Sequence, residues 1–341
     1  MMQKILVTGG TGYIGSHTAV ELINAGFEIV IIDNLSNSSI EVLTGIKNIT
    51  GIKPEFHKID LTDKQKTNEF FYSVKDIDAI IHFAAYKAVG ESVEKPLMYY
   101  ENNIVSLINV LKNIKEHKIK GLVFSSSCTV YGQAEVLPVT EQTPIIKADS
   151  PYGNTKQISE EIIADFISSE KYSKAISLRY FNPIGAHESA EIGELPLGVP
   201  NNLVPFITQT AIGLREQLNV FGDDYNTPDG TAIRDYIHVV DLAKAHIVAL
   251  KRMLENKNKK QYEVFNIGTG NGNSVLDVIK TFEEVNNLKL NYKIAPRRAG
   301  DIEKVWADTS FANKELGWKT EKTLADALKS AWEWEKKIRS K

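Results

Sequence analysis

The sequence predicts a doubly wound α/β fold, in which helices cover both faces of a parallel sheet, followed by a smaller C-terminal α/β domain. Three observations predict it. Short apolar segments alternate with helical patterns over the first 180 residues. A glycine-rich turn follows the first apolar segment, and after Tyr180 the chain becomes rich in glycine and proline with little periodicity.

The first unit is a strand, a glycine loop, a helix and a second strand. We expect strands at Lys4–Thr8 and Glu28–Asp33, with a helix between them that ends near Gly26. The turn Gly9-Gly10-Thr11-Gly12-Tyr13-Ile14-Gly15 lets backbone N–H groups approach a pyrophosphate at the helix N-terminus. Asp33 stands 18 residues after Gly15, where a carboxylate accepts hydrogen bonds from a ribose and repels a 2′-phosphate. This unit predicts a Rossmann-like domain that binds NAD rather than NADP.

The rest of the first domain supplies further strands and their ends. We expect residues 1–181 to form the NAD-binding domain, residues 182–341 to form the substrate domain, and a segment near 236–270 to return to the first. The predicted strands are Glu55–Ile59, Asp78–Ala84, Gly121–Ser127 and Ala175–Tyr180, with helices at Lys95–His117 and Tyr152–Ser168. Asp60 and Leu61 end one strand and either contact the adenine or lie beside a helix cap. Phe83 and Ala84 leave the next strand with Lys87 beyond, where its ammonium would lie near the nicotinamide or in solvent.

Composition excludes several classes of protein. With 341 residues, 43% hydrophobic and 24% charged, the chain is ordinarily globular. A net charge of −3 argues against partners such as nucleic acid or anionic membranes. The single cysteine, Cys128, fits a reducing compartment, and neither an apolar run of 18 residues nor metal-ligand spacing is present. We therefore expect a cytoplasmic protein without a membrane span, signal peptide or metal.

The segment that follows Ser150-Pro151 predicts the chemistry. A capping hydroxyl and a proline start a helix on which Tyr152 and Lys156 lie one turn apart. A phenol titrates near ~10, and a nearby ammonium favours its phenolate. Such a phenolate can accept a proton from a sugar hydroxyl. Ser127, at the carboxyl end of a strand, can bridge that hydroxyl to Tyr152, unless the polar strand end only caps a helix.

Two arginines follow the long loop. Arg234 and Arg298 suit a diphosphate, because a guanidinium donates paired, charged hydrogen bonds. His238 is expected to pack or cap a helix rather than catalyse.

Together these segments resemble the UDP-glucose 4-epimerase group of the extended short-chain dehydrogenase/reductase family. The matching segments are Thr8–Gly15, His82–Ser92, Phe124–Gly132, Tyr152–Lys156, Arg179–Gly185, Pro200–Leu203, Arg234–His238 and Pro296–Asp301. The resemblance implies a tightly held NAD and interconversion of UDP-galactose and UDP-glucose through a transient 4-keto sugar.

The resemblance also assigns roles to residues. Ser127, Tyr152 and Lys156 match the catalytic trio: Tyr152 as base, Lys156 on the nicotinamide ribose, and Ser127 on the sugar hydroxyl. The cofactor-binding residues are Gly9, Gly12, Tyr13, Ile14, Gly15, Asp33, Asn34, Asp60, Leu61, Phe83, Ala84, Lys87, Tyr152, Lys156 and Tyr180. The UDP-sugar-binding residues are Lys87, Ser127, Asn182, Asn202, Leu203, Phe221, Arg234, Tyr236, Arg298, Asp301 and Val305.

Two positions depart from related patterns. The sister 4,6-dehydratases carry an Asp-Glu pair where this chain has Cys128-Thr129, so no acid is available to expel the 6-hydroxyl. Val305 stands where epimerases restricted to unsubstituted hexoses tend to carry tyrosine, which predicts that UDP-GalNAc and UDP-GlcNAc are also interconverted unless a neighbouring side chain fills the space.

Other functions stay open from sequence alone. One alternative is a 4-epimerase of pentose or uronic-acid nucleotides. The carboxylate of a uronic acid would need an extra cation in the sugar pocket, and sequence alone does not show whether Lys87 is free to supply it. A non-catalytic NAD-binding regulator would have lost Tyr152 or Lys156, and both are present. The resemblance further implies a homodimer, for which Lys95–His117 and Tyr152–Ser168 are the candidate helices.

Overall fold

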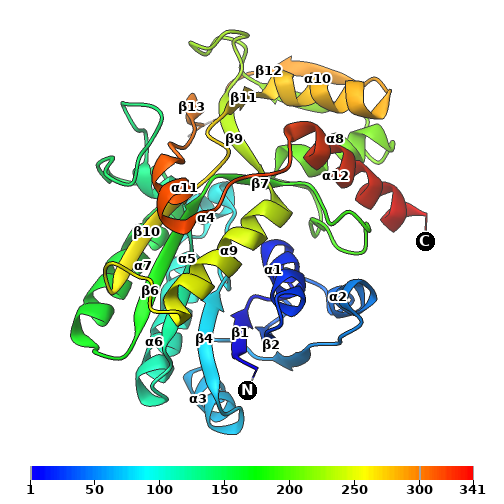
Figure 1. Cartoon of the computed structure of the whole chain (residues 1–341). Helices are drawn as coiled ribbons and strands as arrows, with labels where there is room; N and C mark the ends of the chain where they lie inside the picture. Colours follow the sequence, from blue (N-terminus) through cyan, green and yellow to red (C-terminus); the bar gives the residue numbers. More distant parts are fainter. Residues whose placement is uncertain (1, 299–300, 341) are drawn as a thin grey trace.

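The computed structural model of the protein describes residues 2–298 and 301–340 (Figure 1). Residues 299 and 300, which belong to the segment Pro296–Asp301 noted above, lie outside the described part.

A parallel sheet of seven strands forms the centre of the first part of the described chain. Its strands, in spatial order, are β10 (Tyr262–Ile267), β6 (Lys174–Tyr180), β5 (Gly121–Ser127), β4 (Ile77–His82), β1 (Lys4–Thr8), β2 (Glu28–Asp33) and β3 (Glu55–Lys58). The order reverses between β1 and β4. In a doubly wound sheet this reversal marks the crevice in which ligands bind. The predicted doubly wound α/β fold is confirmed.

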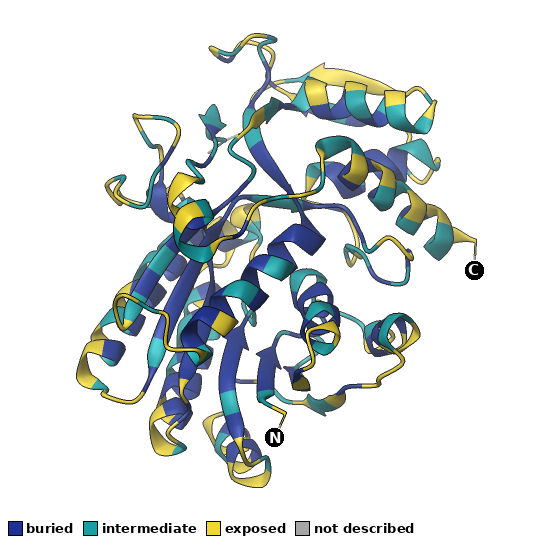
Figure 2. Cartoon of the chain, in the orientation of Figure 1, coloured by how far each residue is buried: buried dark blue, intermediate teal, exposed yellow. Residues whose placement is uncertain are grey.

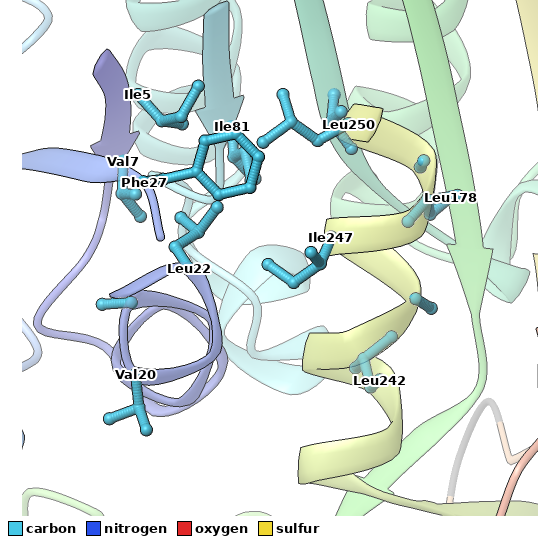
Figure 3. Close-up of a cluster of buried hydrophobic side chains, with 14 of the residues drawn as sticks. Ile5, Val7, Val20, Leu22, Phe27, Ile81, Leu178, Leu242, Ile247 and Leu250 are labelled. Carbon is cyan, nitrogen blue, oxygen red and sulfur yellow. The ribbon is translucent and has the colours of Figure 1, made fainter. Parts of the chain in front are cut away.

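Helices cover both faces because strand residues point alternately to each side. On one face, Ile5 and Val7 of β1 pack with helices α1 (Tyr13–Asn24), α2 (Val42–Thr50) and α9 (Val239–Leu254) (Figure 3). On the other face, Leu6 packs with α3 (Lys64–Ser73), α6 (Ser106–Glu116) and α7 (Pro151–Ser169). Figure 2 shows the resulting contrast between buried strands and exposed outer helix faces.

The predicted continuous helix Lys95–His117 is wrong in its interior. Helices α4 (Val89–Glu94) and α5 (Pro96–Tyr100) are followed by a wider π-helical turn, η1 (Glu101–Val105), before α6 begins. Asn103 in this turn exchanges hydrogen bonds with the backbone of Tyr86 at 2.8 and 3.1 Å and donates to Thr155 Oγ1 at 3.0 Å. Such widened turns are common at functional sites, and this one ties the loop after β4 to helix α7.

The C-terminal part is a smaller α/β unit, seen at the top of Figure 1. Its strands are β7 (Asn182–Ile184), β9 (Ile233–His238), β11 (Gly272–Ser274) and β13 (Lys304–Val305), together with the pair β8 (Leu218–Phe221) and β12 (Tyr292–Ala295). Its helices are α8 (Leu203–Ala211), α10 (Val275–Asn286) and α12 (Leu324–Arg339), which share one apolar core. Helix α11 (Ser310–Leu316) lies against β10 instead.

Most of the segment near 236–270 returns to the first part of the chain, but residues 236–238 belong to β9 of the C-terminal part. Helix α9 packs on α1, and β10 pairs in parallel with β6 along its whole length. His238 accepts a hydrogen bond from Val240 N, so it caps α9 as expected. The division of the chain at residue 181 stays a prediction, but Tyr262–Ile267 belongs to the first sheet.

Candidate active site

The glycine loop between β1 and α1 is shaped by close backbone contacts. Gly9 has φ +69°, and a Cβ there would lie 2.8 Å from Ala84 N. A Cβ on Gly15 would lie 2.3 Å from the carbonyl oxygen of Gly9, and one on Gly12 would lie 3.1 Å from the same oxygen. Helix α1 starts at Gly12 without a side-chain cap, so its first N–H groups face outward for an anion. Tyr13 and Ile14 form the first turn of this helix.

The ends of β2 and β3 carry the carboxylates predicted for the adenosine. Asp33 accepts hydrogen bonds from Thr11 N at 3.3 Å and Leu35 N at 2.9 Å, which fix it against the glycine loop. Asn34 donates to Asp60 at 3.2 Å, so these two residues adjoin.

Leu61 is placed differently from the other adenosine-side residues. Its side chain is buried in the core, and its carbonyl accepts from Asn109 Nδ2 at 2.9 Å. Asp63 caps α3, as the alternative interpretation of this segment held.

The loop after β4 approaches the same crevice. Phe83 N donates to Thr8 O at 3.0 Å, which places Phe83 and Ala84 beside the glycine loop. Lys87 lies half-exposed with its Nζ 6.0 Å from the centre of the Tyr13 ring. The Tyr13 hydroxyl in turn donates to Gly185 O at 2.6 Å, which joins the glycine loop to the start of the C-terminal part.

Ser127, Tyr152 and Lys156 converge where β5 meets α7. All three are buried, and Ser150 caps α7 by accepting from Gly153 N at 3.1 Å. Lys156 Nζ donates to Ser125 O at 2.7 Å, and it lies 4.8 Å from the centre of the Phe124 ring and 6.0 Å from that of Tyr152. Tyr180 is joined to this group by a 2.6 Å hydrogen bond with Ser125 Oγ.

The expected lowering of the Tyr152 pKa by Lys156 is not seen in this arrangement. Burial raises the pKa of Tyr152 well above its usual value, the Tyr180 phenol raises it further, and the Ser127 hydroxyl lowers it. The main cause is burial of the phenol, and the ammonium of Lys156 donates its hydrogen bond to Ser125 O. Burial also lowers the pKa of Lys156 to about 8, although the charge of Glu160 raises it.

The diphosphate candidates gather around Asp301. Arg298 donates to this carboxylate at 2.7 and 3.2 Å, and Arg234 Nη2 lies 4.0 Å from it. The Arg298 guanidinium also lies 5.8 Å from the centre of the half-exposed Phe221 ring. Two guanidinium groups and an aromatic face thus meet at the end of β8, a combination that suits a nucleotide diphosphate.

The remaining substrate candidates lie on the neighbouring strands and at the start of α8. Asn182 of β7 is in register with Tyr236 of β9, and burial raises the pKa of the Tyr236 phenol to about 12. Asn202 precedes α8, and Leu203 is its first residue, packed against the C-terminal core.

Sequence reasoning missed Glu194. This carboxylate accepts from Lys87 Nζ at 3.3 Å and from Asn202 Nδ2 at 2.5 Å, so it links two predicted site residues from different parts of the chain. It lies in the irregular loop between β7 and α8, where no periodicity singles it out.

The residues fit NAD. The backbone cradle at Gly9, Gly12 and Gly15 leaves no space for side chains, the uncapped start of α1 suits a pyrophosphate, and the Asp33 carboxylate ends β2.

Across residues 2–298 and 301–340, no group of three His, Cys, Asp or Glu side chains is arranged to hold a metal ion. Within the same ranges, no helix combines the length and apolarity that a membrane crossing requires.

Comparison with known proteins identifies the family. The chain is 49% identical over 333 residues to the UDP-glucose 4-epimerase of Haemophilus influenzae, and the match covers 97% of each chain. The chain belongs to the UDP-glucose 4-epimerase family. The family model described as GDP-mannose 4,6 dehydratase also matches residues 6–331, which places these epimerases within a wider group of related folds.

Solved structures of UDP-glucose 4-epimerases superpose closely on this chain. The enzyme from Bifidobacterium longum, in complex with NAD+ and UDP, is 45% identical with a TM-score of 0.94, and the match covers 99% of both chains. The enzyme from Stenotrophomonas maltophila, with bound NAD and formylated UDP-arabinopyranose, is 44% identical with a TM-score of 0.95, and the match covers 100% of this chain and 99% of that one.

In this member of the UDP-glucose 4-epimerase family, Cys128 and Thr129 follow Ser127 in a single 3₁₀ turn, η2 (Cys128–Tyr131). Burial raises the pKa of the Cys128 thiol to about 12, and Thr129 Oγ1 is buried without a hydrogen-bond partner. Neither group is a carboxylic acid that could protonate a leaving hydroxyl. Val305 is buried next to this turn, packed with Tyr131 and Phe181.

Proposed function

We propose that this protein is an NAD-dependent 4-epimerase that interconverts UDP-galactose and UDP-glucose. One observation carries the proposal: the buried trio of Ser127, Tyr152 and Lys156 lies at the carboxyl edge of the sheet that also bears the glycine loop. The same edge faces the C-terminal part, where Arg234 and Arg298 suit a diphosphate. NAD, when bound, supplies a reversible hydride acceptor for carbon 4 of the sugar.

The proposed roles of the trio follow from its surroundings. Tyr152, once ionised to the phenolate, accepts the proton of the 4-hydroxyl on oxidation and returns it on reduction. Ser127, which is buried at the end of β5, orients that hydroxyl. Lys156 holds a positive charge beside them, anchored to the backbone by its bond to Ser125 O. Because the site is buried, these interactions act in a low dielectric and out of reach of water.

On the substrate side, the residues offer strong contacts to the nucleotide and fewer contacts to the sugar. Arg234 and Arg298 would exchange part of their pairing with Asp301 for the diphosphate, and Phe221 offers a ring at the same end. Tyr236 and Asn182 line the adjoining strands. A sugar held mainly through its nucleotide can turn over in the pocket and present its other face.

The test is to purify the protein, add no cofactor, and follow UDP-galactose to equilibrium by NMR. Formation of UDP-glucose by the protein, and its loss in Tyr152→Phe, are expected. If UDP-galactose is unchanged even after NAD is added, the proposed activity is wrong. Conversion of a UDP-pentose or UDP-uronic acid in its place would support the alternative 4-epimerases, and NAD binding without any conversion would support a non-catalytic regulator.

We also propose that UDP-GalNAc and UDP-GlcNAc are interconverted, because Val305 is small where a tyrosine would project a ring beside Cys128. Val305→Tyr is expected to remove turnover of the N-acetylated sugars while UDP-galactose is still converted, as followed by the same NMR assay. Unchanged turnover of UDP-GalNAc in Val305→Tyr would contradict this proposal.

We further propose a cytoplasmic homodimer. Its support is a set of exposed apolar side chains on α4, α5 and η1, namely Val89, Val93, Leu97 and Val105. These residues lie within or beside the helix Lys95–His117 that was predicted to pair. The single cysteine suits a reducing compartment.

A further inference from the structure

The Glu194 carboxylate joins the two sides of the candidate site. Glu194 lies in the loop between β7 and α8, and 13% of its side chain is exposed. Its Oε1 accepts from Lys87 Nζ at 3.3 Å and from Asn202 Nδ2 at 2.5 Å. One carboxylate therefore pairs with a cation from the loop after β4 and with an amide that directly precedes α8.

Helix α12 fixes the backbone that carries this carboxylate. Trp334 Nε1 donates to Glu194 O at 2.9 Å, and a Cβ on Gly193 would lie 2.5 Å from Cγ of the same indole ring. Earlier in the loop, Lys337 of α12 pairs with Glu191 at 2.5 Å. The loop is therefore held against α12, and the Glu194 side chain extends from a fixed backbone into the site.

Lys87 borders both the cofactor side and the proposed catalytic helix. Its Nζ lies 6.0 Å from the centre of the Tyr13 ring, which follows the glycine loop. The preceding residue, Tyr86, is tied through Asn103 to Thr155 of α7, at 3.1 and 3.0 Å. Lys87 is thus a cation that a charged group on the sugar could meet, and Glu194 already pairs it.

We propose that Glu194 is a specificity-determining residue: by pairing with Lys87 it makes that cation unavailable to a carboxylate on the sugar, so the site takes UDP-hexoses and discriminates against UDP-hexuronic acids. This inference rests on the proposed function, since it concerns the sugar bound in the same site. A uronic acid would lose water from its carboxylate and meet Glu194 as a like charge, and both effects oppose binding.

The other cations of the site have different partners. Lys156 is buried and donates to Ser125 O at 2.7 Å. The two arginines beside Asp301 are assigned to the diphosphate in the proposed function. Lys87 is therefore the site cation whose availability Glu194 controls.

UDP-glucose and UDP-glucuronic acid are the probes, because they share the nucleotide and differ only in the hydroxymethyl or carboxylate group at carbon 5. Isothermal titration into the NAD-loaded protein gives the Kd of each, at low ionic strength because salt screens a partly exposed pair. The unmodified protein should bind UDP-glucuronic acid more weakly. In Glu194→Gln, which keeps an oxygen to accept from Asn202, the Kd ratio of UDP-glucuronic acid to UDP-glucose should fall by about tenfold or more, the effect of one gained charged hydrogen bond.

Three further variants separate the charge of Glu194 from a structural effect. Glu188→Gln is the matched control, because Glu188 is an exposed carboxylate in the same loop, and its Kd ratio should equal that of the unmodified protein. Glu194→Gln/Lys87→Met should lose the gain in uronic-acid binding, because the freed cation is gone. Lys87→Met alone leaves the Glu194 charge and should raise the ratio, and it takes the place of Glu194→Gln if that variant does not fold.

A fall of the ratio in Glu194→Gln that Lys87→Met reverses would support the inference. An unchanged ratio in folded Glu194→Gln, or equal affinity of the unmodified protein for both nucleotides, would overturn it. If the unmodified protein binds no UDP-glucose, the proposed function fails and this inference with it, whereas UDP-glucose binding with an unchanged ratio overturns this inference alone.

Discussion

Substitution of Gly15 by alanine tests the glycine loop. The new Cβ would lie 2.3 Å from Gly9 O and 2.9 Å from Gly10 Cα. Ordinary contact requires roughly 1 Å more, so the start of α1 must move away from the loop, and overpacking of this kind costs about 1–3 kcal/mol. If that movement breaks one hydrogen bond from the loop to a charged pyrophosphate, it removes a further ~1.5–3 kcal/mol of binding free energy. The Kd for NAD should therefore rise by roughly 10–150-fold.

Isothermal titration of NAD into the cofactor-stripped protein measures this effect, and a thermal melt measures the change in stability. Gly90→Ala is the matched control, because Gly90 lies in α4 and an added Cβ there meets nothing within 4 Å. The melting temperature of Gly15→Ala should fall by roughly 1–4 °C, whereas Gly90→Ala should melt at the same temperature or slightly higher. Unchanged NAD affinity in Gly15→Ala would refute the assignment of this loop to the pyrophosphate.

Two further changes test the substrate side and the assembly. Arg298→Met should raise the KM for UDP-galactose by roughly 10–150-fold, because it removes a paired, charged contact to the diphosphate. Arg297→Met should leave the KM nearly unchanged, because the Arg297 guanidinium pairs with Asp224 on the surface. Steady-state kinetics measure both values, and equal effects of the two substitutions would contradict the assignment of Arg298 to the diphosphate. Leu97→Glu should convert the proposed homodimer to a monomer in sedimentation velocity, because Leu97 is 79% exposed on the proposed interface. Ile52→Glu, on another exposed segment, should leave the assembly unchanged, and a dimeric Leu97→Glu would exclude Leu97 from the interface.

Much of the fold could be predicted from sequence because its signals are local. The glycine loop, the apolar strands and the Ser150-Pro151 helix start each follow from a few adjacent residues, and the structure has them within one or two positions. The widened turn at Glu101–Val105 could not be predicted in this way. It depends on Asn103 reaching Tyr86 and Thr155, which are distant in sequence.

The same distinction applies to the site. Tyr152 and Lys156 were predictable because helical spacing places them on one face. Glu194 was not, because its partners Lys87 and Asn202 come from two other segments and meet only in the folded chain. Likewise, a pKa depends on burial in the folded chain, and burial is what raises the pKa of the Tyr152 phenol.

The late strand β10 has a consequence for how the chain folds during synthesis. The edge of β6 gains its partner only when Tyr262–Ile267 has been made, roughly 90 residues after Tyr180. At ~5–20 residues per second, the ribosome needs ~5–20 s to complete that interval. During this time the nascent chain exposes an unpaired strand edge and the apolar face that α9 later covers, both of which favour aggregation. A chaperone that binds this intermediate would act between the synthesis of residue 180 and that of residue 267.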